Sequence, residues 1–402
     1  MRDYFVRLLN GLCKHPLLSV FFLALLVRLL VAGTVVAFFK GSLFLDDHTY
    51  LELVRAHNLK GVQPGDGLFW NSNRGFLEPV AFISKVLGEL PLVTHLVPAV
   101  AGSVTAVAVT ALLKRHTTSA VALGGGSLAA ILPSQVLWSS LLLKDSLIWM
   151  SLSLTALALA WWSDREAARD FAIGAIAMTG LVGYLSTLRL HTLVVCCIAV
   201  AAATGWRRGY WRIQFMAVAA TLLLVVPWLA GAGVAGIDIL RLGASGLEQQ
   251  RQAAAVGGAS AFGNSVTIEA VRDILYLPTG LRIMLIDPLP IHLDQSAGVL
   301  LAFFENLVWY PIMVLAIYGV PVVRQRSPEL IFTLLMLVGL ATMWALVEGN
   351  FGTAFRHRGE FVWATLVLAG IGADRLLSRR RGHRSPYICS KEEDKANKPR
   401  HQ

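Results

Sequence analysis

Two adjacent carboxylates, Asp46 and Asp47, are the first side chains along the sequence that could do chemistry. Residues 47–60, which begin at the second of these carboxylates, have apolar residues spaced so that they would lie on one face of a helix. This spacing predicts a short amphipathic helix. A carboxylate held at a membrane surface can act as a general base toward a hydroxyl group, or can join a metal site. Asp is also favoured at helix N-termini, so either carboxylate could instead cap this helix. The two roles can be divided between the pair.

A second candidate is the arginine pair Arg356 and Arg358, which follows a stretch that begins at Glu348 and contains Gly349 and Gly352. The glycines permit tight backbone geometry. Arginine presents a planar fork of donors that suits phosphate oxygens. At a membrane surface the obvious phosphate belongs to a lipid, so the pair predicts a site for a lipid phosphate. General contact with anionic headgroups would explain the same two residues.

Three further segments place charges beside apolar runs, and each predicts a substrate contact. Arg74 closes the run Trp-Asn-Ser-Asn-Arg, a composition common around sugars but also typical of an interfacial loop. Lys144 and Asp145 lie between two apolar runs, where ionisable side chains usually face a cavity or each other. Asp145 would equally suit the N-terminus of the next helix. Arg189 also lies between two apolar runs, and its side chain could simply reach the interface.

The composition determines which elements must hold these residues. The chain has 402 residues, of which 55% are hydrophobic and 15% charged, against roughly a quarter charged in soluble domains. Its mean hydropathy is +0.61. These values exclude a disordered protein and a soluble enzyme with one core, and the recurring apolar runs exclude a single membrane anchor. We expect an all-α polytopic membrane protein. The net charge of +10 reflects loop Arg and Lys, which set orientation, and does not indicate nucleic acid.

The apolar runs predict about ten transmembrane helices, since a span needs about 20 apolar residues. The predicted spans are 16–39, 91–113, 118–142, 145–162, 171–188, 190–205, 214–236, 299–323, 329–347 and 360–378. Basic residues alternate between the connecting segments, which predicts a multi-pass protein of the cell (plasma) membrane with both termini in the cytoplasm. Residues 1–15 and the basic, disordered segment 379–402 would be cytoplasmic tails around a transmembrane domain, 16–378. Residues 40–90, 237–298 and 348–359 would be exported loops.

Together, three of these motifs resemble those of bacterial GT-C glycosyltransferases. They are the Asp pair after the first span, the Pro-Ser…Ser…Lys-Asp stretch that ends at Asp145, and the late Gly-Asn-x-Gly-Thr-x-x-Arg-x-Arg stretch that ends at Arg358. More narrowly, the chain is similar to dolichyl-phosphate-mannose protein mannosyltransferase-like membrane proteins encoded with surface-polysaccharide genes. The likeness covers about residues 16–378. The chain is shorter than many members and has Lys144-Asp145 in place of a plain acidic pair.

This resemblance implies inverting transfer of a sugar from a polyprenyl-phosphate donor, on the exported face, to a glycan, lipid or protein acceptor. By that likeness Asp46 or Asp47 would be the base, and Arg356 or Arg358 would hold the donor phosphate. A lipid phosphate is a good leaving group, so positioning and charge balance suffice. The sequence has no nucleotide-binding motif and implies no certain cofactor, although a divalent cation is compatible with the acidic residues.

Two other activities use the same residue types. A polysaccharide polymerase or ligase would act on polyprenyl-diphosphate-linked glycans with the same exported arginines and carboxylates. A lipid or glycan transporter would show repeated halves and charged or broken helices at mid-membrane. The sequence has no evident repeat, and most of the candidate charges lie at span ends, with Arg28 as the exception. The glycosyltransferase interpretation therefore accounts for more of the candidate residues and their positions than the transporter interpretation does.

Overall fold

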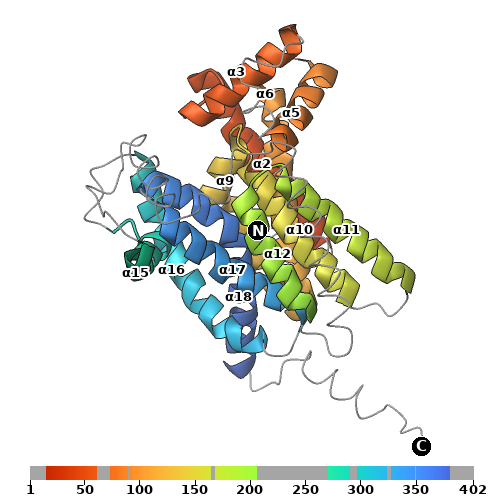
Figure 1. Ribbon diagram of the computed structural model, residues 1–402, viewed down its shortest axis with the longest axis vertical. Coiled ribbons are helices and arrows are strands. Elements are labelled where there is room, and N and C mark those ends of the chain that lie inside the picture. Colours follow the sequence, from red (N-terminus) through yellow and green to blue (C-terminus); the bar gives the residue numbers. More distant parts are fainter. Residues whose placement is uncertain are drawn as a thin grey trace, which may run out of the picture.

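The structure is a computed structural model that describes residues 15–60, 73–88, 90–163, 168–205, 270–289, 297–323, 327–348 and 350–380. Across these segments the chain is almost entirely helical and has no strand, which confirms the predicted all-α class. The helices pack into a bundle with a smaller group of helices, α3, α5 and α6, at one end (Figure 1). The predicted tails and most of the predicted loop 237–298 lie outside the described residues.

The helices are, in chain order, α2 (Pro16–Phe39), α3 (Leu45–Lys60), α5 (Arg74–Leu87), α6 (Pro91–Thr94), α7 (Leu96–His116), α8 (Ser119–Ile131), α9 (Pro133–Ser140), α10 (Asp145–Ser163), α11 (Ala168–Ser186), α12 (Leu190–Gly205), α15 (Ala270–Leu285), α16 (Ala297–Val323), α17 (Pro328–Val347) and α18 (Phe351–Arg380). The predicted helix 47–60 is confirmed as α3. Helix α15 lies within the predicted loop 237–298.

Six helical segments of the described residues are long and apolar enough to cross a membrane, or seven if one bent pair counts as a span. The six are Pro16–Phe39, Pro91–His116, Asp145–Ser163, Gly298–Val323, Pro328–Val347 and Phe351–Arg379. Two shorter apolar helices, Ile173–Ser186 and Leu190–Thr204, coincide with the short predicted spans. The predicted span 214–236 lies outside the described residues. The protein is therefore a multi-pass membrane protein, but the count of ten is not confirmed.

The predicted span 118–142 is not one straight helix. It consists of α8 and α9, which meet at an angle of 51° around Leu132 and Pro133. Proline lacks a backbone N–H and its ring clashes with the preceding turn, so Pro133 favours the start of a new helix over continuation of the old one.

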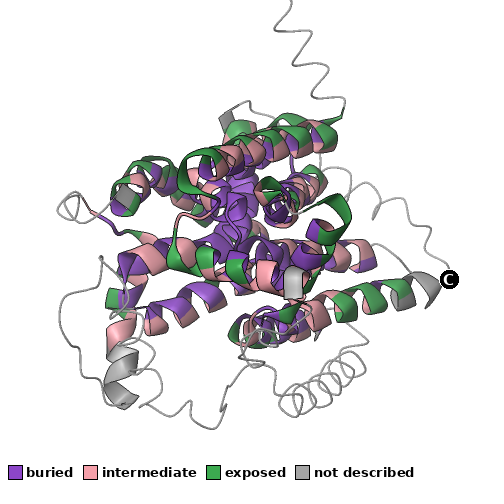
Figure 2. Cartoon of the chain, turned by 90° about the horizontal axis from the view of Figure 1, so that it is seen from above, coloured by how far each residue is buried: buried purple, intermediate pink, exposed green. Residues whose placement is uncertain are grey.

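Helix α18 is the central element of the bundle. Every residue from Arg358 to Gly372 is buried, and the view from above shows buried segments in the middle with exposed faces at the periphery (Figure 2). A Cβ atom added to Gly319 of α16 would lie 2.1 Å from the carbonyl oxygen of Leu368, and one added to Gly372 would lie 1.9 Å from that of Leu315. The two helices therefore approach backbone to backbone, as small residues allow in membranes.

The start of α18 corrects the predicted loop 348–359. Residues 351–359 form the first turns of this helix, because Asn350 caps it. The Asn350 side-chain oxygen accepts a hydrogen bond from the Gly352 N–H at 2.8 Å, and its carbonyl accepts one from the Ala354 N–H. Arg356 and Arg358 consequently lie on a helix.

Candidate functional site

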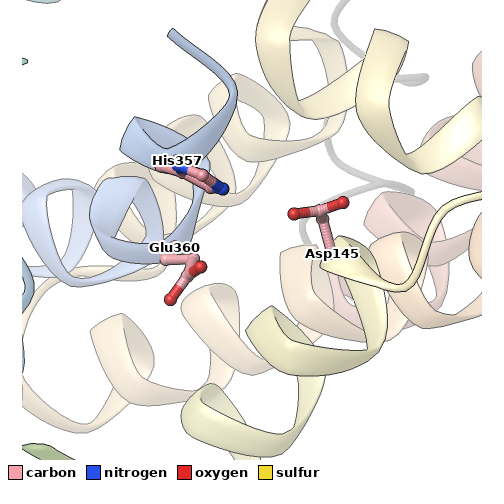
Figure 3. A group of neighbouring side chains, drawn as sticks. All are labelled: Asp145, His357 and Glu360. Carbon is pink, nitrogen blue, oxygen red and sulfur yellow. The ribbon is translucent and has the colours of Figure 1, made fainter. Parts of the chain in front are cut away.

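The site lies where the N-terminal ends of α10 and α18 meet. Asp145 is the first residue of α10, and its carboxylate faces His357 and Glu360 on α18 (Figure 3). Helix α10 begins there because an acidic side chain is favoured beside the positive end of the helix dipole. Asp145 is fully buried, so its charge requires close partners.

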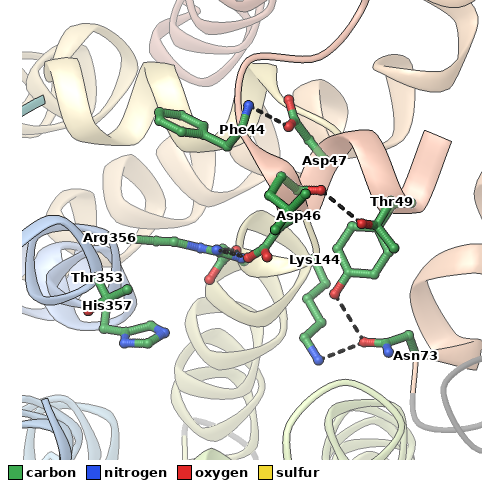
Figure 4. A network of polar contacts seen from close by, with 12 residues as sticks. Phe44, Asp46, Asp47, Thr49, Asn73, Lys144, Thr353, Arg356 and His357 are labelled. Carbon is green, nitrogen blue, oxygen red and sulfur yellow. Dashed lines mark hydrogen bonds and ion pairs between the residues drawn. The ribbon is translucent and has the colours of Figure 1, made fainter. Parts of the chain in front are cut away.

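Arg356 is the main partner of Asp145 and also reaches α3. Its Nε and Nη2 donate to Asp145 Oδ2 at 2.9 and 2.7 Å. Its Nη1 donates to Asp46 Oδ2 at 2.6 Å (Figure 4). The side chain of Asp46 is 58% exposed, whereas that of Arg356 is 13% exposed. One guanidinium thus joins a buried carboxylate to an exposed one.

Arg189 provides the second positive charge. It follows α11 and donates from Nη2 to Asp145 Oδ1 at 3.2 Å, while Nη1 donates to Glu360. Glu360 also accepts a hydrogen bond from the Thr192 hydroxyl at 2.8 Å. The Arg189 side chain is 8% exposed, so it lies within a buried ion network, a different position from the interfacial one that the sequence left open.

The two adjacent carboxylates have different surroundings. Asp47 accepts hydrogen bonds from the backbone N–H groups of Leu43 and Phe44, both at 2.7 Å, and is completely buried. A third-position acid that reaches back to the helix start is one half of a capping box. Burial raises the pKa of Asp47, and the two N–H bonds oppose that rise. Asp46, in contrast, is exposed and points toward Arg356.

Lys144 lies beside this network and contacts α3 through Asn73. Its Nζ donates to Asn73 Oδ1 at 2.8 Å (Figure 4). The Tyr50 hydroxyl donates to the same oxygen at 3.2 Å. Burial, with a smaller contribution from Arg189, lowers the pKa of Lys144 to about 7. Burial raises the pKa of Tyr50 to about 12, which keeps its hydroxyl a donor.

Three residues of this group, Asp145, His357 and Glu360, are of the types that bind divalent metal ions. One ligand atom from each of Asp145, His357 and Glu360 lies within 4.8 Å of the others (Figure 3), and carboxylate with imidazole suits a divalent cation. However, Arg189 and Arg356 donate to these carboxylates, so a metal ion would face two guanidinium charges at contact distance. The donor set does not fit a resident cation. We assign the positive charge of the site to the two arginines.

Removal of divalent metal should therefore leave the activity of this site unchanged. Exhaustive treatment with a chelator, followed by assay of the sugar transfer that the sequence predicts, with and without added Mg²⁺ or Mn²⁺, measures this. Activity that disappears after chelation and returns with one metal would show that the arginine pairs open to admit a cation.

Two of the predicted substrate-binding residues, Arg358 and Arg74, lie apart from the network. Arg358 is 1% exposed and donates to the carbonyl oxygens of Met284 and Asp287, at 2.9 and 2.5 Å, and to Asn306 Oδ1 at 2.6 Å. Arg74 lies on α5 and pairs with Glu78 at 2.5 Å on an exposed face. Neither guanidinium contacts Asp46 or Asp145, and their substrate-binding roles stay predictions.

Sequence reasoning missed Glu360 and gave His357 no role. His357 stacks on Trp344, with ring centroids 3.7 Å apart, and its Nδ1 hydrogen-bonds to Glu348. Glu360 looked like the first residue of a span. Glu360 lies four residues after Arg356, and residues i and i+4 share a helix face. This spacing is the sequence feature that could have placed Glu360 in the site.

No protein-family model and no curated protein matches the chain. Among solved structures, it is similar to the archaeal oligosaccharyltransferase AglB from Archaeoglobus fulgidus, in complex with an inhibitory peptide and a dolichol-phosphate. The match covers 97% of this chain and 53% of that one, with a TM-score of 0.51 and 14% sequence identity. The chain thus spans about half the length of this neighbour. The likeness shows that the chain shares the fold of this neighbour, while membership of the GT-C superfamily and of its narrower bacterial group stays a prediction.

Proposed function

We propose that this chain is a membrane glycosyltransferase that moves a sugar from a polyprenyl-phosphate donor to a glycan, lipid or protein acceptor on the exported face of the cell membrane. The observation that carries the proposal is the Arg356 guanidinium, which joins the buried Asp145 to the exposed Asp46. The fold shared with the archaeal oligosaccharyltransferase supports the reaction class. The dolichol-phosphate bound to the archaeal neighbour supports a lipid-linked partner in general terms.

In this proposal Asp46 is the general base. It accepts the proton of the acceptor hydroxyl while that oxygen attacks the anomeric carbon from the face opposite the phosphate. The bond between the anomeric carbon and the phosphate oxygen breaks at the same time, and the lipid phosphate leaves with the electron pair. Arg356 stabilises the negative charge of the departing phosphate, and Asp145 holds the guanidinium in place. Arg189 pairs with Asp145 and Glu360 and so balances part of their negative charge.

The test is transfer from a panel of polyprenyl-phosphate sugars by the purified protein, measured as release of polyprenyl phosphate. Asp46→Asn should lower turnover about 10²–10⁴-fold, the usual effect of a general base. Asp47→Asn should cost on the order of 1 kcal/mol of stability, as loss of a helix cap does, and retain activity per folded molecule. Glu52→Gln is the matched control, because Glu52 is an exposed acid on the same helix.

Near-normal turnover in Asp46→Asn, with stable expression, would remove Asp46 as the base. Release of polyprenyl diphosphate in place of the monophosphate would instead favour the polymerase or ligase activity.

Lys144 gives the proposal a pH dependence. Its pKa of about 7 means that the free protein loses this positive charge as pH rises above neutrality. A bound phosphate favours the protonated form and raises that pKa, so donor affinity should be greatest below pH 7 and fall by up to about tenfold per pH unit above it. Lys144→Arg keeps its charge and should flatten the profile. Donor binding from pH 6 to pH 9 measures this, and an unchanged slope in the Arg variant would exclude Lys144 as the titrating group.

A further inference from the structure

The break between α8 and α9 leaves backbone groups without helical partners inside an apolar segment. Pro133 has no N–H, so the carbonyl of Ala129 loses its usual donor. The N–H of Ser134 donates to Glu305 Oε2 at 2.5 Å and is not directed to the Ala130 carbonyl. Unpaired backbone groups are costly in a membrane, so both carbonyls need another donor.

Arg28 supplies that donor. Its Nη1 donates to the Ala130 carbonyl at 3.0 Å and its Nη2 to the Ala129 carbonyl at 3.4 Å. Its Nε donates to the Ser139 hydroxyl at 2.7 Å, on the far side of the break. The side chain is 1% exposed, and all of its hydrogen-bond acceptors within the described residues are neutral oxygens. A buried cation in a span normally marks a functional requirement, and here that requirement is the break itself.

Glu305 of α16 completes the arrangement with the opposite charge. Besides the Ser134 N–H, it accepts the Ser134 hydroxyl at 2.7 Å through Oε1. A cation therefore lies at the C-terminal end of α8 and an anion at the N-terminal end of α9, each beside the helix end whose dipole favours it. The two charges sit on either side of the break, each bonded to the backbone of one half-helix.

Helix α9 is in turn a direct support of the site. The Trp138 ring packs on Phe44, just before α3, with centroids 5.2 Å apart. The Arg356 guanidinium lies 5.9 Å from the centre of the same ring. The carbonyl of Ser140, at the end of α9, accepts a hydrogen bond from His95. The direction of α9 after the break thus determines where the Trp138 ring lies relative to Arg356 and Phe44.

We infer that Arg28 and Glu305 are positioning residues for the site, because together they hold α9 in the bent direction that places Trp138 against Arg356 and Phe44. The effect on sugar transfer rests on the proposed function, whereas the effect on the position of α9 does not.

The first test measures that position without any substrate. Phe44→Cys and Trp138→Cys are introduced after the four native cysteines are replaced by Ala, and a short bifunctional thiol reagent is added. Mass spectrometry should find the two peptides joined when Arg28 and Glu305 are intact. Joining should fall strongly in Arg28→Gln and in Glu305→Gln, and less in Arg28→Lys, which keeps a charged donor. Undiminished joining in both Gln variants would overturn the inference even if the protein transfers no sugar.

The second test separates positioning from simple stability. In the triple variant Arg28→Gln, Glu305→Gln, Pro133→Ala, the new N–H can pair with the Ala129 carbonyl, so a straight helix no longer needs the charges. This variant should regain thermal stability, yet transfer should stay about a hundredfold low, the loss expected from a displacement of about 1 Å. Recovery of transfer together with stability would reduce Arg28 and Glu305 to structural residues. If stability does not recover, the joining yield in the single variants decides.

Discussion

Replacing Arg356 should abolish most of the activity. Arg356→Ala removes the only group described that contacts both Asp46 and Asp145, so turnover should fall about 10²–10³-fold, as for loss of a preorganised charge at a reacting oxygen. Arg356→Lys should recover little of this, because an ammonium cannot reproduce the planar fork that engages Asp145 and, in the proposed mechanism, a phosphate as well. Donor affinity and turnover, both per folded molecule, are the measurements.

The matched control is Arg55→Lys, an exposed arginine on α3 that pairs with Glu52 at 3.0 Å. It should bind donor like the unmodified protein. If Arg356→Lys also binds donor and turns it over normally, a positive charge at position 356 is sufficient for activity and the guanidinium fork is not required. General contact with anionic headgroups would then explain the residue better than a donor site.

Replacing Asp145 should have the largest effect on stability. Asp145→Asn leaves the buried Arg189 and Arg356 without their shared counter-charge, and breaking a buried pair in this way typically costs about 3–5 kcal/mol. The exposed pair of Arg74 and Glu78 offers the control, since Glu78→Gln should cost less than about 1 kcal/mol. The thermal unfolding midpoints of the two variants in the same detergent compare them.

A second change distinguishes charge imbalance from lost packing. In Asp145→Asn, Arg189 keeps the buried Glu360 as its partner, whereas Arg356 keeps only the exposed Asp46. Adding Arg356→Gln to Asp145→Asn removes the less well compensated cation, so the double variant should regain part of the lost stability. A loss for Asp145→Asn no larger than that for Glu78→Gln would mean that the carboxylate is not the anchor of the network.

The sequence predicts the composition of the site better than its geometry. Lys144, Asp145 and Arg189 stand out because charges beside apolar runs are rare and need a reason. Which charge pairs with which depends on the packing of α10 against α18, and no local pattern encodes that. The different surroundings of Asp46 and Asp47 likewise depend on the backbone direction before α3, which only the folded chain defines.

The misplaced boundary of α18 has a simple physical cause. The charged residues Arg356, His357 and Arg358 lower the local hydropathy, so a hydropathy criterion starts the span after them. In the structure each of these charges has a partner, and the Asn350 cap begins the helix earlier. The break at Pro133 corresponds to a proline in an apolar run, which the sequence shows. The backbone groups that the break leaves unpaired are bonded by Arg28 and Glu305, and these contacts join segments more than 100 residues apart in the sequence.

The contact between Arg356 and Asp46 has a consequence for the order in which substrates act. In the proposed mechanism, Asp46 occupies the Nη1 edge of the guanidinium until the donor arrives, so its Oδ2 atom is not free to contact an acceptor hydroxyl. A donor phosphate that takes this edge releases Asp46, while Nε and Nη2 stay on Asp145. Steady-state kinetics should then be ordered, with donor binding first and free polyprenyl phosphate inhibiting competitively against it. The resting protein would also be unable to activate a stray acceptor, or water, before a sugar has arrived.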